Sequence, residues 1–396
     1  MPSFSRVCVR PRPATLVAAL AVVLATSPGS CDVRCIQFGD SAVRPAPPGR
    51  LRHDASIAAL GSAAGTDAIL FASAPAYRLE ERGPRGPGAK GDGAWVRTVD
   101  PASLAQAAIA GVPGPVLGIT RGATSTWLST RSGLNYLAAD GQFAAAEFGF
   151  APGAWLVEAG ITVSIGVPPP PFRFTTADMR PTMLAVDTVG RVWILENHLA
   201  LALLPQAAAP GAQAGEYLAA GRTVVGPAAL AADAHEGVWL YDCRPEERLC
   251  RLTVRDGADG PEVAVVETVA RPIPALVAPL MVTGDAVGVA VVGQAADGDY
   301  LVQYQRGKAS SSPLPAELFH ARHVTALAAD QQGRIYAATD GVGVLVREAG
   351  QWRVHPITES LPVLGRTDLK PVDDILLSED GTLYAACQDT LAVWTP

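Results

Sequence analysis

One short motif recurs along the chain, and it limits the possible folds more than any other feature. Each copy has a small or acidic residue, a short polar turn, a Gly, and then an apolar run with an aromatic residue near its start. The clearest copies are DTVGRVWILE (187–196), DQQGRIYAAT (330–339) and SEDGTLYAAC (378–387). DAHEGVWLYD (233–242) matches them with one extra turn residue, and looser copies lie at 63–73, 122–134 and 283–293.

The spacing of these copies indicates a repeat architecture. The aromatic residue or its replacement stands at Leu70, Trp127, Trp193, Trp239, Val289, Tyr336 and Tyr384. The last five positions are 46 to 50 residues apart, whereas the first three are 57 and 66 apart, as if those copies carried insertions. A period of about 45–50 residues is typical of the four-stranded blades of a β-propeller.

The residues around each motif predict the strands of a blade. Apolar runs precede the turns at 182–186, 228–232, 325–329 and 373–378 and are expected to form inner strands buried on both faces. Third strands are expected at 342–348 and 389–394, and a fourth at 351–356. The Ala-rich stretch 206–221 contains Pro210, Gly211 and Gly215 and is expected to be an insertion loop. The fold class is therefore all-β, a single propeller of about seven four-stranded blades, with six to eight possible.

The last copy ends one strand short of a blade, and an early segment can complete it. CDVRCIQFG (31–39) has strand character and precedes the first copy. We expect this strand to close the ring, because joining the first and last blades removes two open sheet edges. The resulting division is 1–30 signal peptide, 31–56 closing strand and Pro-rich spacer, and 57–396 propeller.

The first thirty residues have the order of an export signal. Arg6, Arg10 and Arg12 precede a 13-residue apolar run at 14–26, which is too short to span a bilayer, and small residues follow. Cleavage is expected near Ser27 or directly before Cys31. The second site resembles a bacterial lipoprotein signal and makes Cys31 the candidate for lipidation, although Pro28 departs from that pattern. The protein is expected in the periplasm, at the outer membrane as a lipoprotein, or secreted.

Charge and cysteine content restrict the partners. The formal net charge is −7 and the chain contains only three Lys, so a nucleic-acid partner is not expected. A membrane is expected to be reached only through a lipid anchor. Cys243 and Cys250 flank the polar segment RPEERL, and a disulfide closing this hairpin is predicted for an exported chain. Cys35 on an outermost fourth strand would lie too far from Cys387 on a second strand for a disulfide.

The copies GRIYAATDGVGVL (333–345) and TWLSTRSGLNYL (126–137) resemble the propeller repeats of two-component regulator periplasmic sensor domains. Thr339, Asp340 and Gly341 match the end of that repeat, as do Thr130, Gly133 and Leu134. The resemblance covers four or five copies and implies a propeller fold outside the cytoplasm. Those sensors usually continue into a membrane helix and signalling domains, so the resemblance implies a stand-alone exported propeller and transfers no catalytic residue.

The sequence contains no GxSxG, HExxH, Walker-type or dinucleotide-binding motif, so no catalytic residue, metal site or cofactor is predicted. The recurring aromatic residues are expected to pack between blades. Ligand-binding candidates come from the loops that follow second strands, where propellers gather loops of several blades at one end of the channel: Arg131, Asn197, His198, Arg244, Asp340 and Asp389.

These observations predict a monomeric, non-catalytic module that binds a protein or a small ligand at the channel face, as an envelope scaffold or sensor-type module. The alternative is a propeller enzyme, a lyase or hydrolase, with its site at the channel mouth.

Overall fold

The protein is described from a computed structural model of the whole chain. The first described strand begins at Asp32, and the side chains described for burial begin at Val116. The described residues are 32–37, 55–62, 69–75, 94–99, 106–112, 116–121, 126–130, 133–137, 143–145, 147–150, 174–175, 183–196, 199–205, 216–257 without 243, 245 and 247, 260–269, 273–319, 323–363, 369–387 and 390–396.

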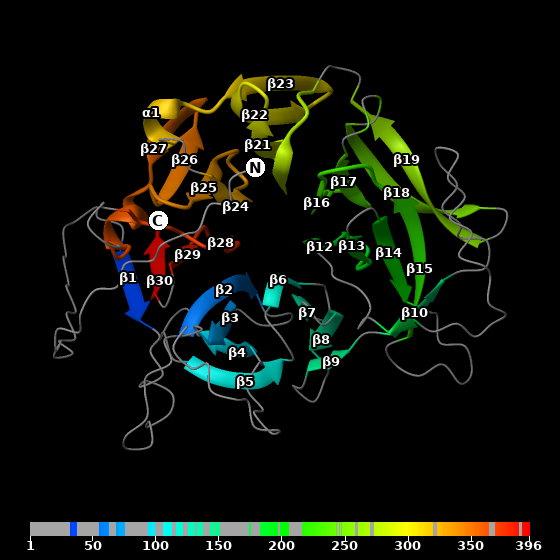
Figure 1. Cartoon of the computed structure of the whole chain (residues 1–396), viewed down its shortest axis with the longest axis horizontal. Coiled ribbons are helices and arrows are strands. Elements are labelled where there is room, and N and C mark those ends of the chain that lie inside the picture. The colour runs from blue at the N-terminus through cyan, green and yellow to red at the C-terminus, as the bar shows by residue number, and fades with distance from the viewer. Residues whose placement is uncertain are drawn as a thin grey trace, which may run out of the picture.

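Seven sheets are arranged radially around a central channel (Figure 1). Six have four antiparallel strands, and one has six strands, of which one pair is parallel. We number them as blades 1 to 7 along the chain. The inner strands of successive blades contact one another around the ring, and the inner strand of blade 7 contacts that of blade 1. The all-β propeller expected from the repeat is confirmed, and the number of sheets lies in the expected range.

The strands of the first three blades follow one another outward from the channel. Blade 1 contains β2 (Ala55–Ser62), β3 (Ile69–Pro75), β4 (Ala94–Val99) and β5 (Gln106–Val112). Blade 2 contains β6 (Val116–Arg121), β7 (Thr126–Thr130), β8 (Gly133–Leu137) and β9 (Phe143–Ala145). Blade 3 contains β12 (Met183–Val186), β13 (Val192–Glu196), β14 (Leu199–Pro205) and β15 (Glu216–Thr223), with β10 (Glu147–Phe150) and β11 (Phe174–Thr175) outside them.

The remaining blades follow the same order. Blade 4 contains β16 (Ala229–Ala232), β17 (Val238–Tyr241), β18 (Leu249–Gly257) and β19 (Gly260–Thr268). Blade 5 contains β20 (Val277–Gly284), β21 (Gly288–Ala295), β22 (Gly298–Gln305) and β23 (Lys308–Pro313), followed by the short helix α1 (Ala316–Phe319). Blade 6 contains β24 (Val324–Ala329), β25 (Ile335–Thr339), β26 (Val344–Glu348) and β27 (Gln351–Val354), followed by the 3-10 helix η3 (Pro356–Ser360). Blade 7 contains β28 (Asp374–Leu377), β29 (Leu383–Cys387) and β30 (Thr390–Thr395).

The early strand closes the ring as expected. β1 (Asp32–Gln37) pairs antiparallel with β30 and becomes the outermost strand of blade 7. Its register places Cys35 opposite Ala392, so β30 separates β1 from β29, which carries Cys387. Because β1 covers its outer edge, β30 is buried at every position except its last.

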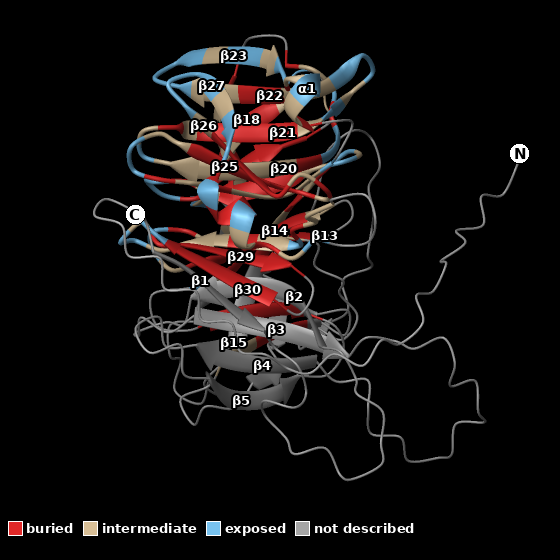
Figure 2. Ribbon diagram, turned by 90° about the vertical axis from the view of Figure 1, so that its left-hand side faces the viewer, coloured by how far each residue is buried: buried red, intermediate tan, exposed pale blue. Residues whose placement is uncertain are grey.

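In the blades whose side-chain burial is described, the second strands are the most completely buried. All five residues of β25 and all five of β29 are buried, whereas β24 and β28 contain only one buried residue each. The expectation that inner strands are buried on both faces is therefore wrong for these blades. An inner strand borders the channel, whereas a second strand has sheet on both sides and neighbouring blades against both faces. Figure 2 shows buried positions on β21 and exposed ones on the outer strand β23.

Blade 3 departs from the four-stranded repeat. β10 pairs in parallel with β15, and β11 pairs antiparallel with β10. The expected insertion loop at 206–221 is partly wrong, because β15 starts at Glu216 and pairs with β14, where Ala220 lies opposite Ala202 and is fully buried. Tertiary pairing with β14 and burial of Ala220 override the helical propensity of the Ala-rich stretch.

Candidate functional site

In blades 3, 4 and 6 an aspartate directly follows the inner strand and organises the turn. In blade 3, Asp187 is 4% exposed and accepts hydrogen bonds from the backbone N–H groups of Val189 and Arg191. Its Oδ2 atom accepts from Arg191 Nε at 2.7 Å and from Trp193 Nε1 at 2.9 Å. One carboxylate therefore fixes the turn, an arginine and the recurring aromatic residue together.

Blade 6 repeats this arrangement with a tyrosine. Asp330 accepts from the backbone N–H groups of Gln332 and Arg334, from Arg334 Nε, and from the hydroxyl of Tyr336. The Arg334 guanidinium lies 5.8 Å from the centre of the Tyr336 ring, within the range of a cation–π contact. Burial is the main reason that the pKa of Tyr336 rises to about 12. The expectation that the recurring aromatic residues pack inside the protein is confirmed for Trp193 and Tyr336, which are at most 1% exposed.

Blade 4 keeps the aspartate and the aromatic residue but lacks the arginine. Trp239 Nε1 donates to Asp233 at 3.2 Å, with the same six-residue separation as in blades 3 and 6. Gly237 stands where those blades have Arg191 and Arg334. Gly237 has φ of +100°, and a Cβ atom there would lie 1.9 Å from the carbonyl oxygen of Leu252, so this turn geometry leaves no room for a side chain.

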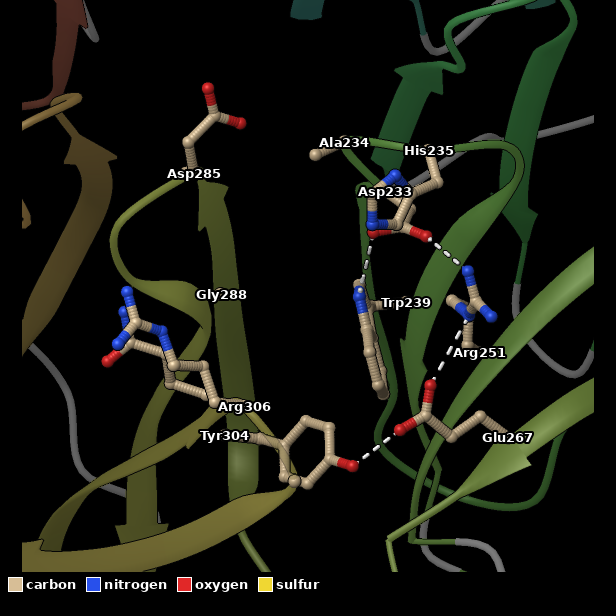
Figure 3. Close-up of a pocket in the computed structure, with 13 residues that line it drawn as sticks. Asp233, Ala234, His235, Trp239, Arg251, Glu267, Asp285, Gly288, Tyr304 and Arg306 are labelled. Atoms are coloured by element: carbon tan, nitrogen blue, oxygen red, sulfur yellow. Dashed lines mark hydrogen bonds and ion pairs between the residues drawn. The ribbon is translucent and has the colours of Figure 1, made fainter.

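A pocket of about 540 Å³ lies between blades 4 and 5 beside this turn (Figure 3). In the equivalent position between blades 3 and 4, Arg191 Nη2 reaches across to Glu236 Oε1 at 2.7 Å. The missing arginine in blade 4 therefore coincides with an open space between the blades. The lining residues are Asp233, Ala234, His235, Trp239, Arg251 and Glu267 from blade 4, and Gly284, Asp285, Gly288, Tyr304, Gln305, Arg306 and Gly307 from blade 5.

The blade 4 wall of this pocket is a connected chain of charged and aromatic groups. Arg251 extends from β18, the strand beside Trp239, and forms ion pairs with Asp233 Oδ2 at 3.0 Å and with Glu267 Oε2 at 3.5 Å. The Tyr304 hydroxyl donates to Glu267 from the facing blade, and the Tyr304 ring lies edge-on to Trp239 with 5.3 Å between the centres. The hydrogen bond to Glu267 is the main reason that the pKa of Tyr304 rises to about 12, so its hydroxyl stays protonated at neutral pH.

The turn residues of the pocket lie between first and second strands and between third and fourth strands, at one end of the ring because successive strands are antiparallel. The other lining side chains come from the strands beside those turns. Of the sequence-predicted residues, Arg244 and Asp340 follow second strands and lie at the opposite end. Arg131, Asn197, His198 and Asp389 lie outside the described residues.

Two of the predicted ligand-binding residues are described, and both hold loops in place. Arg244 donates through Nε to the fully buried Asp242 and through Nη2 to the carbonyl of Thr223 at 2.7 Å. The Asp340 carboxylate accepts from the backbone N–H of His323, and the Asp340 N–H donates to the His323 carbonyl. Their role in binding stays a prediction.

Some of the other predictions from the sequence concern residues that the structure does not describe. Cys31 and Cys243 lie outside the described residues, so the lipidation site and the Cys243–Cys250 disulfide stay predictions. Within the described ranges no three His, Cys, Asp or Glu side chains are grouped so that they could hold a metal ion. None of the helices in the described part of the chain is long and apolar enough to cross a membrane.

The position of this pocket corresponds to an irregularity in the repeat. The copy at 233–242 differs from its neighbours at the arginine position, and the copy at 283–293 lacks the aromatic residue. Glu267 and Tyr304 follow no repeat pattern, so their place in the pocket could not be found from the sequence.

No protein-family model and no curated protein sequence matches the chain. Solved structures do match. One is the extracellular domain assigned to a one-component system of B. thetaiotaomicron, with 13% identity, a TM-score of 0.51, and coverage of 92% of this chain and 42% of that one. A second, assigned to a hybrid two-component system of the same organism, has 12% identity, a TM-score of 0.51, and coverage of 91% and 42%.

A gluconolactonase from Xanthomonas campestris matches with 12% identity, a TM-score of 0.40, and coverage of 91% and 94%, which is too distant to support an inference. The chain spans less than half the length of the two sensor-system domains it matches. The resemblance to sensor-type propellers that the repeats indicated is confirmed at the level of the fold: the chain is a β-propeller similar to the extracellular domains of such systems.

Proposed function

We propose that the protein is an exported, non-catalytic β-propeller that binds a small ligand in the pocket between blades 4 and 5, as a sensor-type module of the cell envelope. The observation that carries this proposal is the pocket itself. Its volume of about 540 Å³ falls in the range of small-molecule sites, and it is lined by two aromatic rings and several convergent polar groups.

The state of the polar groups supports binding rather than chemistry. Asp233 and Glu267 are both engaged with Arg251, and the Tyr304 hydroxyl is fixed by its hydrogen bond to Glu267, which raises the pKa of Tyr304 to about 12. These groups form a fixed, pre-organised wall, and a wall of this kind recognises a ligand without a large ordering cost. The fold likeness to extracellular sensor domains supports a location outside the cytoplasm, in agreement with the signal-like segment at 1–30.

Thermal-shift screening with a metabolite library tests the proposal. Ala234 is exposed and lines the pocket, so Ala234→Trp should fill it, whereas Ala296→Trp places the same side chain in the exposed β21–β22 turn at the other end of blade 5. We expect library compounds that stabilise the wild type and Ala296→Trp but not Ala234→Trp. Finding no stabilising compound, or equal stabilisation of all three proteins, would contradict the site. Turnover of a bound compound would contradict the non-catalytic assignment and favour the enzyme alternative.

A further inference from the structure

The charges that line the pocket leave it with an excess of one negative charge. Three carboxylates, those of Asp233, Glu267 and Asp285, face two guanidinium groups, those of Arg251 and Arg306, with His235 counted as neutral. Arg251 is occupied by ion pairs with two of the carboxylates. Asp285 is exposed, and no described hydrogen bond or ion pair involves its carboxylate. The pocket therefore favours a cationic ligand.

The protein itself contains two examples of what such a pocket holds. In blade 6 the Arg334 guanidinium pairs with Asp330 and lies over the Tyr336 ring. In blade 3 the Arg191 guanidinium pairs with Asp187 and crosses to Glu236 in the neighbouring blade. Each guanidinium thus pairs with a turn carboxylate; Arg334 in addition lies over an aromatic ring, and Arg191 reaches a second carboxylate across the blade boundary.

Blade 4 keeps the turn carboxylate and the aromatic ring, but the guanidinium that pairs with Asp233 comes from Arg251 on β18, and no arginine side chain of the turn crosses toward blade 5. Trp239 is bonded to Asp233 as in the other blades, and Asp285 in the first turn of blade 5 stands one residue before the position equivalent to Glu236 in blade 4. Arg251 approaches Asp233 from β18, and Gly237 has no side chain to enter the space between the blades. Figure 3 shows Asp285 on the blade 5 side of this space and Trp239 on the blade 4 side.

We propose that this pocket binds a small guanidinium compound, whose cationic group lies between blades 4 and 5 where, between blades 3 and 4, Arg191 Nη2 reaches across to Glu236. This rests on the proposed function, because it names the class of ligand for the same site. The guanidinium group lies against the Trp239 ring and donates hydrogen bonds to the Asp285 carboxylate. Arg306, at the exposed β22–β23 turn, is available for an anionic group at the far end of the ligand.

Calorimetric titration with methylguanidinium tests the ligand class, and methylurea is its neutral control of the same shape. We expect millimolar binding of methylguanidinium to the wild type and binding of methylurea weaker by about tenfold or more, as for a cation held by an aromatic ring and a carboxylate. Asp285→Asn should weaken methylguanidinium binding by about three- to tenfold. Asp297→Asn, in the exposed turn at the opposite end of blade 5, should leave it unchanged.

The outcomes separate this inference from the proposed function. Equal binding of methylurea and methylguanidinium, or equal loss in Asp285→Asn and Asp297→Asn, overturns the guanidinium assignment. If methylguanidinium does not bind but a library compound stabilises the wild type and not Ala234→Trp, the ligand class is wrong and the pocket stands as a binding site. If neither binds, both proposals fail.

Discussion

At the scale of single residues, the turn aspartates hold the repeat together. Asp187 accepts four hydrogen bonds, and its removal would leave Arg191 Nε and the Trp193 N–H without their acceptor in a buried place, although Arg191 Nη2 would keep Glu236. Loss of one partner of a buried ion pair is among the most destabilising single changes, because the other charge stays buried. The short acidic turn motif therefore serves stability in blades 3 and 6.

Asp187→Ala is expected to lower the free energy of unfolding by about 3–5 kcal/mol, because it breaks a buried ion pair and three further hydrogen bonds. Urea unfolding followed by tryptophan fluorescence measures this. The matched control is Asp380→Ala in the corresponding turn of blade 7, where the aspartate is exposed and bonds only to Ser378 and Thr382. That variant should lose only about 1 kcal/mol. Equal losses would contradict the role of the buried carboxylate.

Gly237→Ala is expected to destabilise the protein far more than Gly190→Ala. Both residues have positive φ, which costs a non-glycine residue about 1–2 kcal/mol. Only Gly237 adds a steric conflict, because its Cβ atom would meet the Leu252 carbonyl at 1.9 Å, whereas nothing lies within 4 Å of a Cβ at Gly190. Unfolding midpoints of the two variants measure the difference. A similar loss in both would show that the blade 4 turn can rearrange, and the open pocket would then need another cause.

His355 makes stability depend on pH. Burial is the main reason that its pKa falls from 6.5 to about 4, with Arg353 and Arg334 lowering it further. Its Nδ1 accepts the Ile357 N–H, and its ring lies edge-on to Trp394 at 4.6 Å. Because the unfolded chain takes up this proton near pH 6.5 and the folded one does not, stability should fall between pH 6.5 and pH 4, by roughly 2–4 kcal/mol.

Unfolding curves at several pH values check this dependence, with His355→Asn as the test variant. Asparagine keeps an acceptor for the N-terminus of η3 but does not titrate, so the fall between pH 6.5 and pH 4 should become shallower. His323→Gln changes an exposed histidine and should keep the wild-type slope. An unchanged slope in His355→Asn would assign the pH dependence to other groups.

At the scale of elements, the sequence predicted strands best where the repeat is regular. The inner strands at 183–186 and 229–232 and the closing strand at 32–37 lie within the expected segments, because turn aspartates, glycines and apolar runs are local signals. β10 and β11 were missed, because β10 pairs with a strand distant in sequence and β11 pairs only with β10. β15 was missed because its Ala-rich sequence, with Pro210, Gly211 and Gly215 nearby, has no local strand pattern. The pocket was not predicted, because it lies where blade 4 has Gly237 in place of an arginine, and a local pattern does not show how neighbouring blades fill such a space.

Deletion of β1 tests whether the ring depends on its closing strand. Without residues 32–37 the outer edge of β30 loses its only described strand partner on that side, and its buried positions become accessible. We expect the melting temperature to fall by about 5 °C, because a protein of this size shifts by only about 1 °C for each kcal/mol lost and the deletion removes a whole strand. A six-residue deletion within 206–215, which belongs to no described strand, is the control. Equal melting temperatures would show that β1 is dispensable.

At the scale of the whole molecule, export remains a prediction from residues 1–30. We expect the mature protein to be recovered from the cell envelope or the medium with an N-terminus between residues 27 and 31. Intact-mass measurement of the purified protein distinguishes the two processing routes, because a lipid adds mass only when Cys31 is the first residue. In the lipoprotein case Cys31→Ser should abolish both the added mass and sensitivity to globomycin. Recovery of the full-length chain from the cytoplasm would contradict export.

The pairing of β1 with β30 also sets the order of events during folding. Asp32 and Thr395 are opposite each other in the finished sheet, although they are separated by almost the entire chain. β1 must therefore wait, without its final partner, until β30 has been made more than 350 residues later. Contacts between such distant segments form slowly, and the ring cannot close before β30 leaves the ribosome. A ring that closes so late in synthesis is well suited to crossing a membrane first and folding afterwards.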